Sequence, residues 1–134
     1  MTSELDALFT AAKTAQARAY VPYSRFKVGA AVRGANGVIY AGCNVENAAY
    51  PVGNCAEASA IAAMIMAGET RIVEAMVIGD GAGLCTPCGA CRQRLREFAA
   101  LDVAVHVADQ NGVRRSFTVG ELLPASFGPD NLAR

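Results

Sequence analysis

The sequence predicts an α/β layered fold, in which a five-stranded mixed sheet carries helices on both faces. Helical and strand-like segments alternate in the middle of the chain, as in folds that cover a partly parallel sheet with helices. Two Asn-Gly dipeptides, at 36–37 and 111–112, each separate two strand-like runs and indicate tight hairpins. A length of 134 residues suits one core, so we expect residues 1–134 to form a single domain.

The first half of the chain predicts a helix, a hairpin and a second helix. Ser3 is a suitable N-cap for a helix with apolar residues at helical spacing, and Pro22 ends the helical pattern. Apolar residues that alternate over 26–32, and the run 38–40, predict the two strands around the first Asn-Gly. The segment 55–67 is rich in Ala, Met and Ile, which predicts a largely buried helix.

The second half continues the alternation. The apolar run 73–78 predicts a buried strand, and Pro87 marks the start of a helix that reaches about Ala99. Strands are expected over 103–107 and 113–117, on either side of the second Asn-Gly. Because a tight hairpin reverses the chain, this last strand can run antiparallel to its neighbour. A short helix is expected near 120–123.

Composition excludes several function classes. The chain is 53% hydrophobic, which is too apolar for a disordered protein, and its 12 basic residues balance 12 acidic ones. Nucleic-acid binders usually carry a basic excess, so we expect a small, nearly neutral ligand and no nucleic-acid partner. No apolar run approaches the roughly 18 residues of a membrane span. Residues 1–6 are polar and acidic, unlike a secretory signal. We therefore expect no membrane partner and a cytoplasmic location.

The five cysteines, at positions 43, 55, 85, 88 and 91, are odd in number and partly clustered. Without an export signal, this pattern indicates metal or redox chemistry rather than a disulfide framework. Cys88 and Cys91 are three residues apart near a helix start, where free N–H groups stabilise thiolates. A zinc site, a redox pair and ordinary packing all fit this motif. Cys85, Cys88 and Cys91 form an alternative set of zinc ligands, although residues so close in the chain would strain a tetrahedral coordination shell. The single histidine, His106, is interpreted as a core residue with satisfied hydrogen bonds.

Cys55 begins the earlier helix together with Glu57. Asn54 as N-cap, with Glu57 three residues later, resembles a capping box, so one interpretation of Glu57 is structural. Residues two apart do not share a helix face, so Glu57 is badly placed to bind a metal beside Cys55. The other interpretation is that Glu57 faces an open position on the metal.

The two segments together favour catalysis. Zinc deaminases combine a His/Cys-x-Glu segment with a later Pro-Cys-x-x-Cys segment, and residues 55–57 and 87–91 have these sequences. Three protein ligands leave one zinc position for water, as in catalytic zinc sites. The pattern predicts one zinc ion per chain and Glu57 as the general acid and base. The predicted ligands are Cys55, Cys88 and Cys91, which leaves Cys43 and Cys85 as free thiols.

Four further segments extend the pattern over nearly the whole chain. They are YVPYSRFKVGA at 20–30, GCNVENAAYP at 42–51, CRQ at 91–93 and LLPASFG at 122–128. With them, the sequence resembles the cytidine deaminase family, specifically its small homotetrameric type. The resemblance implies the layered fold of that family. It also implies hydrolytic deamination of cytidine and deoxycytidine to uridine and deoxyuridine with release of ammonia, in pyrimidine salvage.

The same resemblance assigns roles to residues outside the zinc segments. Asn44 and Glu46 look like the pair that hydrogen-bonds the ribose hydroxyl, and Phe26 like the aromatic residue that packs on the pyrimidine. The Ala56 backbone N–H is expected to bind the base, and the Thr86 carbonyl to face its amino group. Without the resemblance, ordinary core packing would be the simpler interpretation of Phe26.

Two aromatic residues are expected to act between subunits. Tyr50 and Phe127 look like residues that complete a pocket across a subunit boundary, and the resemblance implies a homotetramer. Ordinary packing is again the alternative for Phe127.

One position departs from the family pattern. In the three-cysteine form of the family the residue after the catalytic Glu is usually Arg, whereas here it is Ala58. Three thiolates and Zn²⁺ sum to a net charge of −1, which that arginine normally softens. Arg92, next to Cys91, resembles a second family arginine, and we expect Arg92 and the N-termini of the two helices to compensate near the zinc ligands. The alternatives are a polar residue elsewhere that takes this role, or a slower enzyme.

Three rival functions differ in what they require. A deaminase of the blasticidin S type shares the zinc motifs, but Asn44, Glu46 and Phe26 favour a nucleoside substrate. A structural zinc domain needs a fourth protein ligand and makes Glu57 incidental. A thiol redox protein requires reversible oxidation of Cys88 and Cys91 and no zinc.

Overall fold

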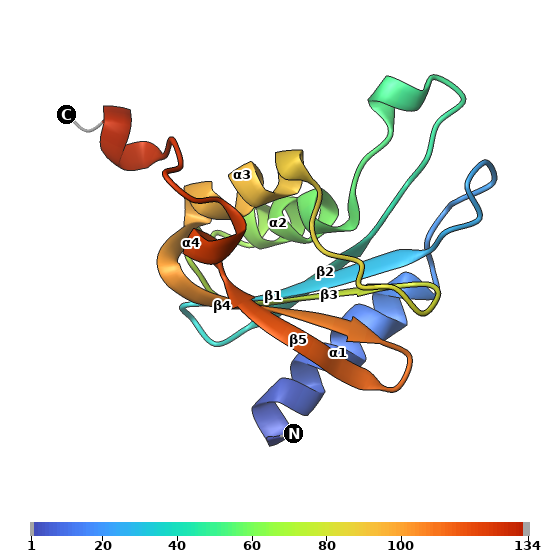
Figure 1. The fold of residues 1–134 in the computed structure, drawn as a ribbon, viewed down its shortest axis with the longest axis horizontal. Coiled ribbons are helices and arrows are strands. Elements are labelled where there is room, and N and C mark those ends of the chain that lie inside the picture. Colours follow the sequence, from blue (N-terminus) through green and yellow to red (C-terminus); the bar gives the residue numbers. More distant parts are fainter. Residues whose placement is uncertain (1, 133–134) are drawn as a thin grey trace.

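A single five-stranded sheet with helices on both faces makes up the computed structural model, which describes residues 2–132 (Figure 1). The helices are α1 (Ser3–Gln16), α2 (Ala56–Met66), α3 (Gly89–Phe98) and α4 (Val119–Leu122). The strands are β1 (Val28–Gly34), β2 (Ile39–Cys43), β3 (Ile72–Gly79), β4 (Ala99–Asp109) and β5 (Gly112–Thr118). Two short 3₁₀ turns, η1 (Tyr50–Val52) and η2 (Pro129–Leu132), complete the described elements.

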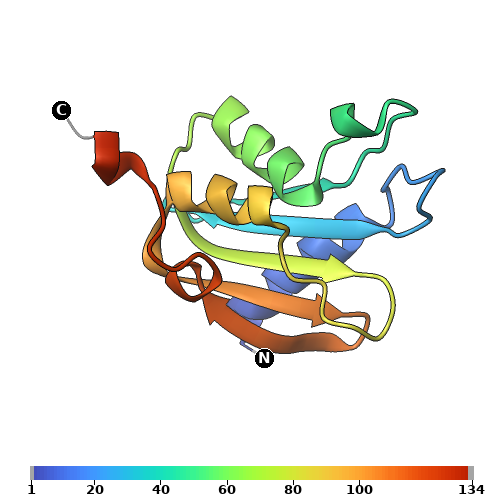
Figure 2. The same ribbon diagram turned by 45° about the horizontal axis from the view of Figure 1, so that its top comes forward.

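The sheet is mixed, as the sequence predicts. Its strand order is β2-β1-β3-β4-β5, with β3 and β4 parallel and the other three neighbouring pairs antiparallel. The parallel pair requires a crossover connection, and α3 supplies it on one face of the sheet (Figure 2). Both predicted hairpins are present, and Gly37 and Gly112 have the positive φ values of +84° and +133° that favour glycine in tight turns.

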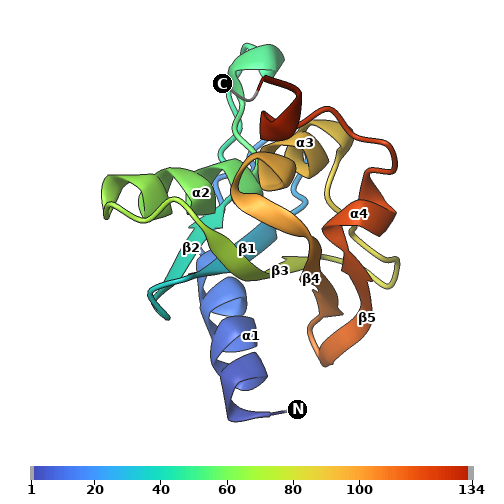
Figure 3. The same ribbon diagram turned by 90° about the vertical axis from the view of Figure 1, so that its left-hand side faces the viewer.

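The helices divide between the two faces of the sheet. α1 covers one face alone, and α2, α3 and α4 cover the other (Figure 3). Gly42 allows α2 to approach β2 closely, because a Cβ at this position would lie 2.4 Å from the Ala60 backbone nitrogen. The fully buried side chains include Leu8 of α1, Met64 of α2, Met76 of β3 and Leu95 of α3. Within residues 2–132, no helix is long and apolar enough to cross a membrane.

Three details at helix ends differ from the expectations. α1 is capped by the Thr2 side chain, which accepts from the Leu5 N–H, and not by Ser3. α1 ends at Gln16, well before Pro22, and the buried Gln16 amide donates to the Lys27 carbonyl 3.1 Å away. α3 begins at Gly89, two residues after Pro87, because the preceding residue is still extended. The different N-cap and the earlier end of α1 do not change the face of this helix that packs on the sheet.

Candidate active site

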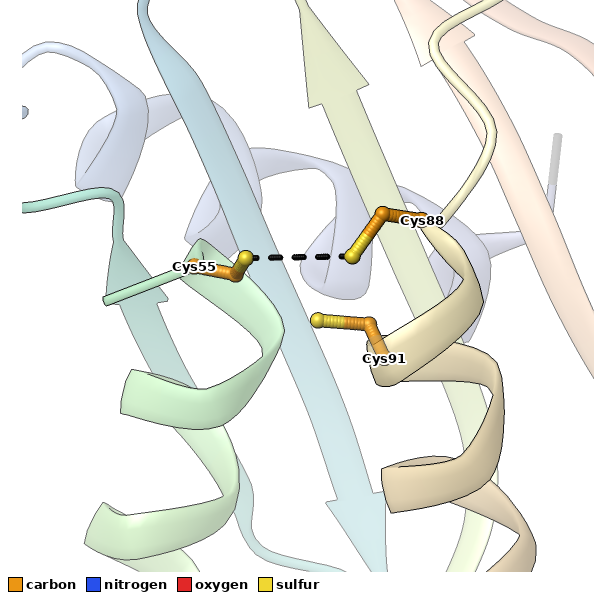
Figure 4. A group of neighbouring side chains, drawn as sticks. All are labelled: Cys55, Cys88 and Cys91. Atoms are coloured by element: carbon orange, nitrogen blue, oxygen red, sulfur yellow. Dashed lines mark hydrogen bonds between the residues drawn. The ribbon is translucent and has the colours of Figure 1, made fainter. Parts of the chain in front are cut away.

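The N-termini of α2 and α3 bring three cysteines together. Cys55 is the N-cap of α2, Cys88 is the N-cap of α3, and Cys91 lies in the first turn of α3. Their sulfur atoms lie within 4.8 Å of one another, and Figure 4 shows all three pointing into the space between the two helices. The cluster joins the two segments that the sequence singles out, although they are far apart in the chain.

The donor set fits one zinc ion. Thiolates bound about 2.3 Å from a tetrahedral zinc ion lie about 3.8 Å from one another. The Sγ atoms of Cys55 and Cys88 are 3.9 Å apart. Within the described part of the chain, the group of mutually close ligand atoms consists of these three sulfurs and includes neither Cys85 nor His106. Three thiolates without a fourth protein ligand match an open, catalytic zinc site rather than a closed structural one.

The surroundings make the thiolates dependent on nearby positive charge. Cys91 has no exposed surface, and burial raises the pKa of its thiol. Burial also raises the pKa of the Cys55 thiol. Burial also acts to raise the pKa of the Cys88 thiol. Hydrogen bonds from the Cys91 backbone N–H and from the Cys91 and Cys55 thiols outweigh this effect, so the pKa of Cys88 is lowered. Because burial penalises the anionic sulfur, a bound divalent cation is the natural partner of this cluster.

Glu57 lies in the first turn of α2 and is 5% exposed. Burial raises the pKa of its carboxyl, against opposing effects from its own backbone N–H, the Cys91 thiol and the charge of Arg94. The capping-box interpretation of Glu57 is wrong, because Cys55 and not Asn54 is the N-cap, and α2 has no side-chain cap. A buried carboxyl that is not held in a capping box is available for acid–base chemistry.

A hollow of about 150 Å³ opens beside the cysteine cluster. The segment that follows β3 closes one side of it. Gly79 ends that strand, and a Cβ there would lie 2.5 Å from the Cys85 side chain, so glycine lets the segment fold back. The lining residues are Val28, Asn44, Cys55, Ala56, Glu57, Cys85, Thr86 and Cys88. Six predicted site residues therefore share one hollow.

Phe26 and Asn44 are linked beside this hollow. The Asn44 side-chain oxygen accepts from the Val28 N–H at 2.9 Å, and its amide nitrogen donates to the Phe26 carbonyl at 2.9 Å. Phe26 itself is 40% exposed, so the core-packing alternative is wrong for it. It lines a neighbouring hollow with Cys85 and Thr86.

Glu46 lies in a separate hollow of about 320 Å³, which Tyr50 also lines. Its carboxylate accepts from the backbone N–H groups of Tyr23 and Ser24, at 3.0 and 3.1 Å, and from the Ser24 hydroxyl. These hydrogen bonds, led by the Ser24 hydroxyl, lower the pKa of Glu46. Within one chain, the structure therefore does not bring Glu46 and Tyr50 into the hollow beside the cysteines.

Tyr50 begins η1 and Phe127 precedes η2, and both of these short turns lie on segments that extend away from the sheet (Figure 1). Tyr50 is 73% exposed and Phe127 is 57% exposed. The core-packing alternative for Phe127 is therefore wrong. Its backbone carbonyl accepts from the Gln93 side chain at 2.8 Å, which ties the C-terminal segment to α3.

Comparison with known proteins is consistent with this site. Residues 2–107 match the family described as the cytidine and deoxycytidylate deaminase zinc-binding region. The chain is 39% identical to a cytidine deaminase of Sporosarcina psychrophila, over 97% of this chain and 96% of that protein. It belongs to the cytidine deaminase family.

Solved structures of the cytidine deaminase family have the same fold. The crystal structure of cytidine deaminase from Burkholderia pseudomallei superposes with a TM-score of 0.86 at 42% identity, covering 95% of this chain and all of that one. The crystal structure of the Mycobacterium tuberculosis enzyme gives a TM-score of 0.79 at 36% identity, covering 92% of this chain and 96% of that one. The predicted layered fold and the zinc cofactor are both confirmed.

The arginine that contacts the cysteine cluster in this family member is not the expected one. The Arg92 guanidinium donates to the carbonyls of Pro87 and Leu122, at 2.8 and 2.9 Å. The guanidinium that donates to a cluster sulfur is that of Arg94, whose Nη1 atom lies 3.4 Å from Cys91 Sγ. Sequence reasoning missed Arg94. The available signal was its spacing of three residues from Cys91, which places both on one helix face.

The remaining predicted residue, His106, is part of the core as expected. It lies in β4 and is 9% exposed. Its ring nitrogens are 2.6 Å from the Ser116 hydroxyl and 2.7 Å from the Glu74 carboxylate, so both are satisfied. His106 is therefore no zinc ligand of this cytidine deaminase fold.

Proposed function

We propose that this chain is a zinc-dependent cytidine deaminase, which hydrolyses cytidine and deoxycytidine to uridine and deoxyuridine with release of ammonia. The observation that carries the proposal is the buried carboxyl of Glu57 in the same hollow as Cys55 and Cys88. We propose that residues 1–134 form a single domain that supplies this chemistry. A nucleoside substrate also implies a role in pyrimidine salvage and a place in the cytoplasm.

The metal site and the acid–base group have distinct tasks. Cys55, Cys88 and Cys91 would hold one zinc ion, which would lower the pKa of water and so supply a nucleophile near neutral pH. Glu57 takes a proton from the attacking water, delivers it to N3 of the cytosine ring, and later protonates the leaving amine. Burial suits this role, since a raised carboxyl pKa makes protonated Glu57 accessible closer to neutral pH.

Backbone and side-chain groups of the hollow orient the base and the sugar. The Ala56 N–H and the Thr86 carbonyl offer one donor and one acceptor to the edge of the pyrimidine, and Phe26 supplies an aromatic face from the adjoining hollow. Asn44 uses one amide hydrogen on the Phe26 carbonyl and keeps a second for a ribose hydroxyl. Glu46 lies outside this hollow, and its carboxylate retains acceptor capacity beyond its three local hydrogen bonds.

The substrate pocket is proposed to be completed by neighbouring chains in a homotetramer. Glu46 and Tyr50 line a hollow separate from the cysteine cluster, and two large aromatic side chains, Tyr50 and Phe127, are largely exposed. Exposed aromatic residues on projecting segments are typical of surfaces that pack against another chain. A neighbour's Phe127 would then close the site of the next chain.

A substrate panel tests the proposed function most directly. Purified protein is assayed for ammonia release from cytidine, deoxycytidine, adenosine and blasticidin S, with Glu57→Gln as the inactive comparison. Activity on the two cytosine nucleosides alone supports the proposal. Activity on blasticidin S alone would assign the chain to the rival deaminase type. Zinc-bound protein with no deamination of any member of the panel would support a structural zinc domain.

A further inference from the structure

The cysteine cluster carries a negative charge that no side chain of α2 offsets. Three thiolates and one Zn²⁺ sum to a net charge of −1 in a partly buried site. α2 has no Lys or Arg between Ala56 and Met66, and the charged residue of its first turn is the acidic Glu57. Position 58 is an alanine. A guanidinium within hydrogen-bond reach of the cluster comes instead from α3.

α3 carries three arginines, and two of them are engaged elsewhere. Arg92 donates to the Pro87 and Leu122 carbonyls and lies 3.3 Å from the Thr86 hydroxyl. Arg96 donates to the Ser126 hydroxyl at 3.0 Å and pairs with the Asp130 carboxylate at 3.5 Å. These contacts tie α3 to the segment before it and to the C-terminal segment, so their role is to position chain segments.

Arg94 is the arginine that contacts the cluster. Its Nη1 atom lies 3.4 Å from the sulfur of Cys91, the one cluster cysteine with no exposed surface. We propose that Arg94 is the positioning residue of the zinc site. It holds Cys91 Sγ in its ligand orientation and offsets the surplus negative charge of the three thiolates. The inference rests on the proposed zinc-dependent function.

Two physical effects of Arg94 on the metal follow. A hydrogen bond to a ligand sulfur withdraws charge from it, so that the thiolate donates less to zinc and the bound metal stays a stronger Lewis acid. The guanidinium also places a positive charge beside a buried sulfur, which favours the thiolate form that binds zinc. Both effects come from α3, where this chain has a cation, and not from α2, where it has Ala58.

The test compares zinc retention in Arg94→Gln, Arg94→Lys and the wild-type chain. Zinc per chain is measured by metal analysis, and its release rate is measured with a chromogenic chelator. The thiolate-to-metal absorption band of the cobalt-substituted protein serves as a spectroscopic signature of the sulfur ligands. Arg18→Gln, at an exposed position after α1, is the matched control. We expect Arg94→Gln to release zinc about 10–100-fold faster and to shift the cobalt band, since altered partners of metal ligands change affinity by that order.

The outcomes separate this inference from the proposed function. Arg94→Lys keeps the positive charge and should retain zinc better than Arg94→Gln, whereas Arg18→Gln should match the wild type. Release rates and cobalt bands unchanged in Arg94→Gln would overturn the role of Arg94 while leaving the deaminase intact. A lysine variant no better than the glutamine variant would also overturn it. A wild-type chain that binds no zinc would instead refute the proposed function.

Discussion

The Sγ atoms of Cys55 and Cys88 lie 3.9 Å apart, although the two residues are 33 positions apart in the sequence. Each is the N-cap of its helix, so the N-termini of α2 and α3 converge on the same point. Unpaired backbone N–H groups and the positive ends of two helix dipoles therefore face the thiolates. This convergence explains why two short motifs on different helices form one anionic metal site.

Metal content is the first prediction. We expect one zinc ion per chain, and we expect Cys55→Ser, Cys88→Ser and Cys91→Ser each to lose most of it, since every substitution removes one of three sulfur donors. Metal analysis of the purified proteins measures this directly. Cys43→Ser and Cys85→Ser are the matched controls and should keep zinc. Loss of zinc from the Cys85 variant alone would contradict the ligand assignment.

Glu57 should be essential for turnover but not for zinc binding or folding. Glu57→Gln keeps the size of the side chain and removes its proton transfer, so kcat should fall by about 10²–10⁴-fold. The readouts are cytidine turnover, zinc content and thermal unfolding. Glu97→Gln, at an exposed position on α3, is the control. Turnover close to the wild-type value in the Glu57 variant would show that this carboxyl has only a structural role.

Free nucleosides, and not cytosine in a polynucleotide, should be substrates. The hollow beside the cysteines is about 150 Å³, and the 12 basic residues are balanced by 12 acidic ones, so the chain offers no basic excess for phosphates. Cytidine, deoxycytidine and a single-stranded oligonucleotide with one cytosine are compared by product chromatography. Efficient conversion of the oligonucleotide would show that the site is more open than proposed.

Assembly should be required for activity. We expect light scattering to give the mass of a tetramer. We also expect Phe127→Ala to lose activity, because each site then lacks an aromatic residue from its neighbour. Mixing Phe127→Ala chains with Glu57→Gln chains should partly restore activity, since some shared sites then contain neither substitution. An active monomer, or mixed chains without recovery, would contradict shared sites.

Arg92 should affect stability and substrate binding more than zinc retention. Arg92→Ala removes donors from the carbonyls of Pro87 and Leu122, which is expected to cost about 1–3 kcal/mol of unfolding free energy. The segment that carries Thr86 should loosen, so KM for cytidine should rise. Urea unfolding and steady-state kinetics measure both. Rapid zinc loss with unchanged stability would restore the charge-compensating role that the sequence alone suggests.

Much of the fold and of the site is readable from local patterns. The Asn-Gly turns, the alternating strands and the apolar helices depend on short-range preferences, so their types and order are confirmed. The ends of α1 and α3 are less accurate, because a cap depends on which neighbouring side chain reaches the free N–H groups. Residues 55–57 and 87–91 predict the zinc site because the donor types and their spacing are themselves the chemistry.

The sequence by itself determined the layered α/β class, the zinc donors and the acid beside them. Tertiary structure decided which side chains support those groups. Arg92 and Arg94 are two residues apart on one helix and are chemically identical, yet one reaches carbonyls of other segments and the other reaches Cys91. The physical reason is that a helix directs residues two apart to different faces, and only the packed neighbours decide which face meets the thiolates.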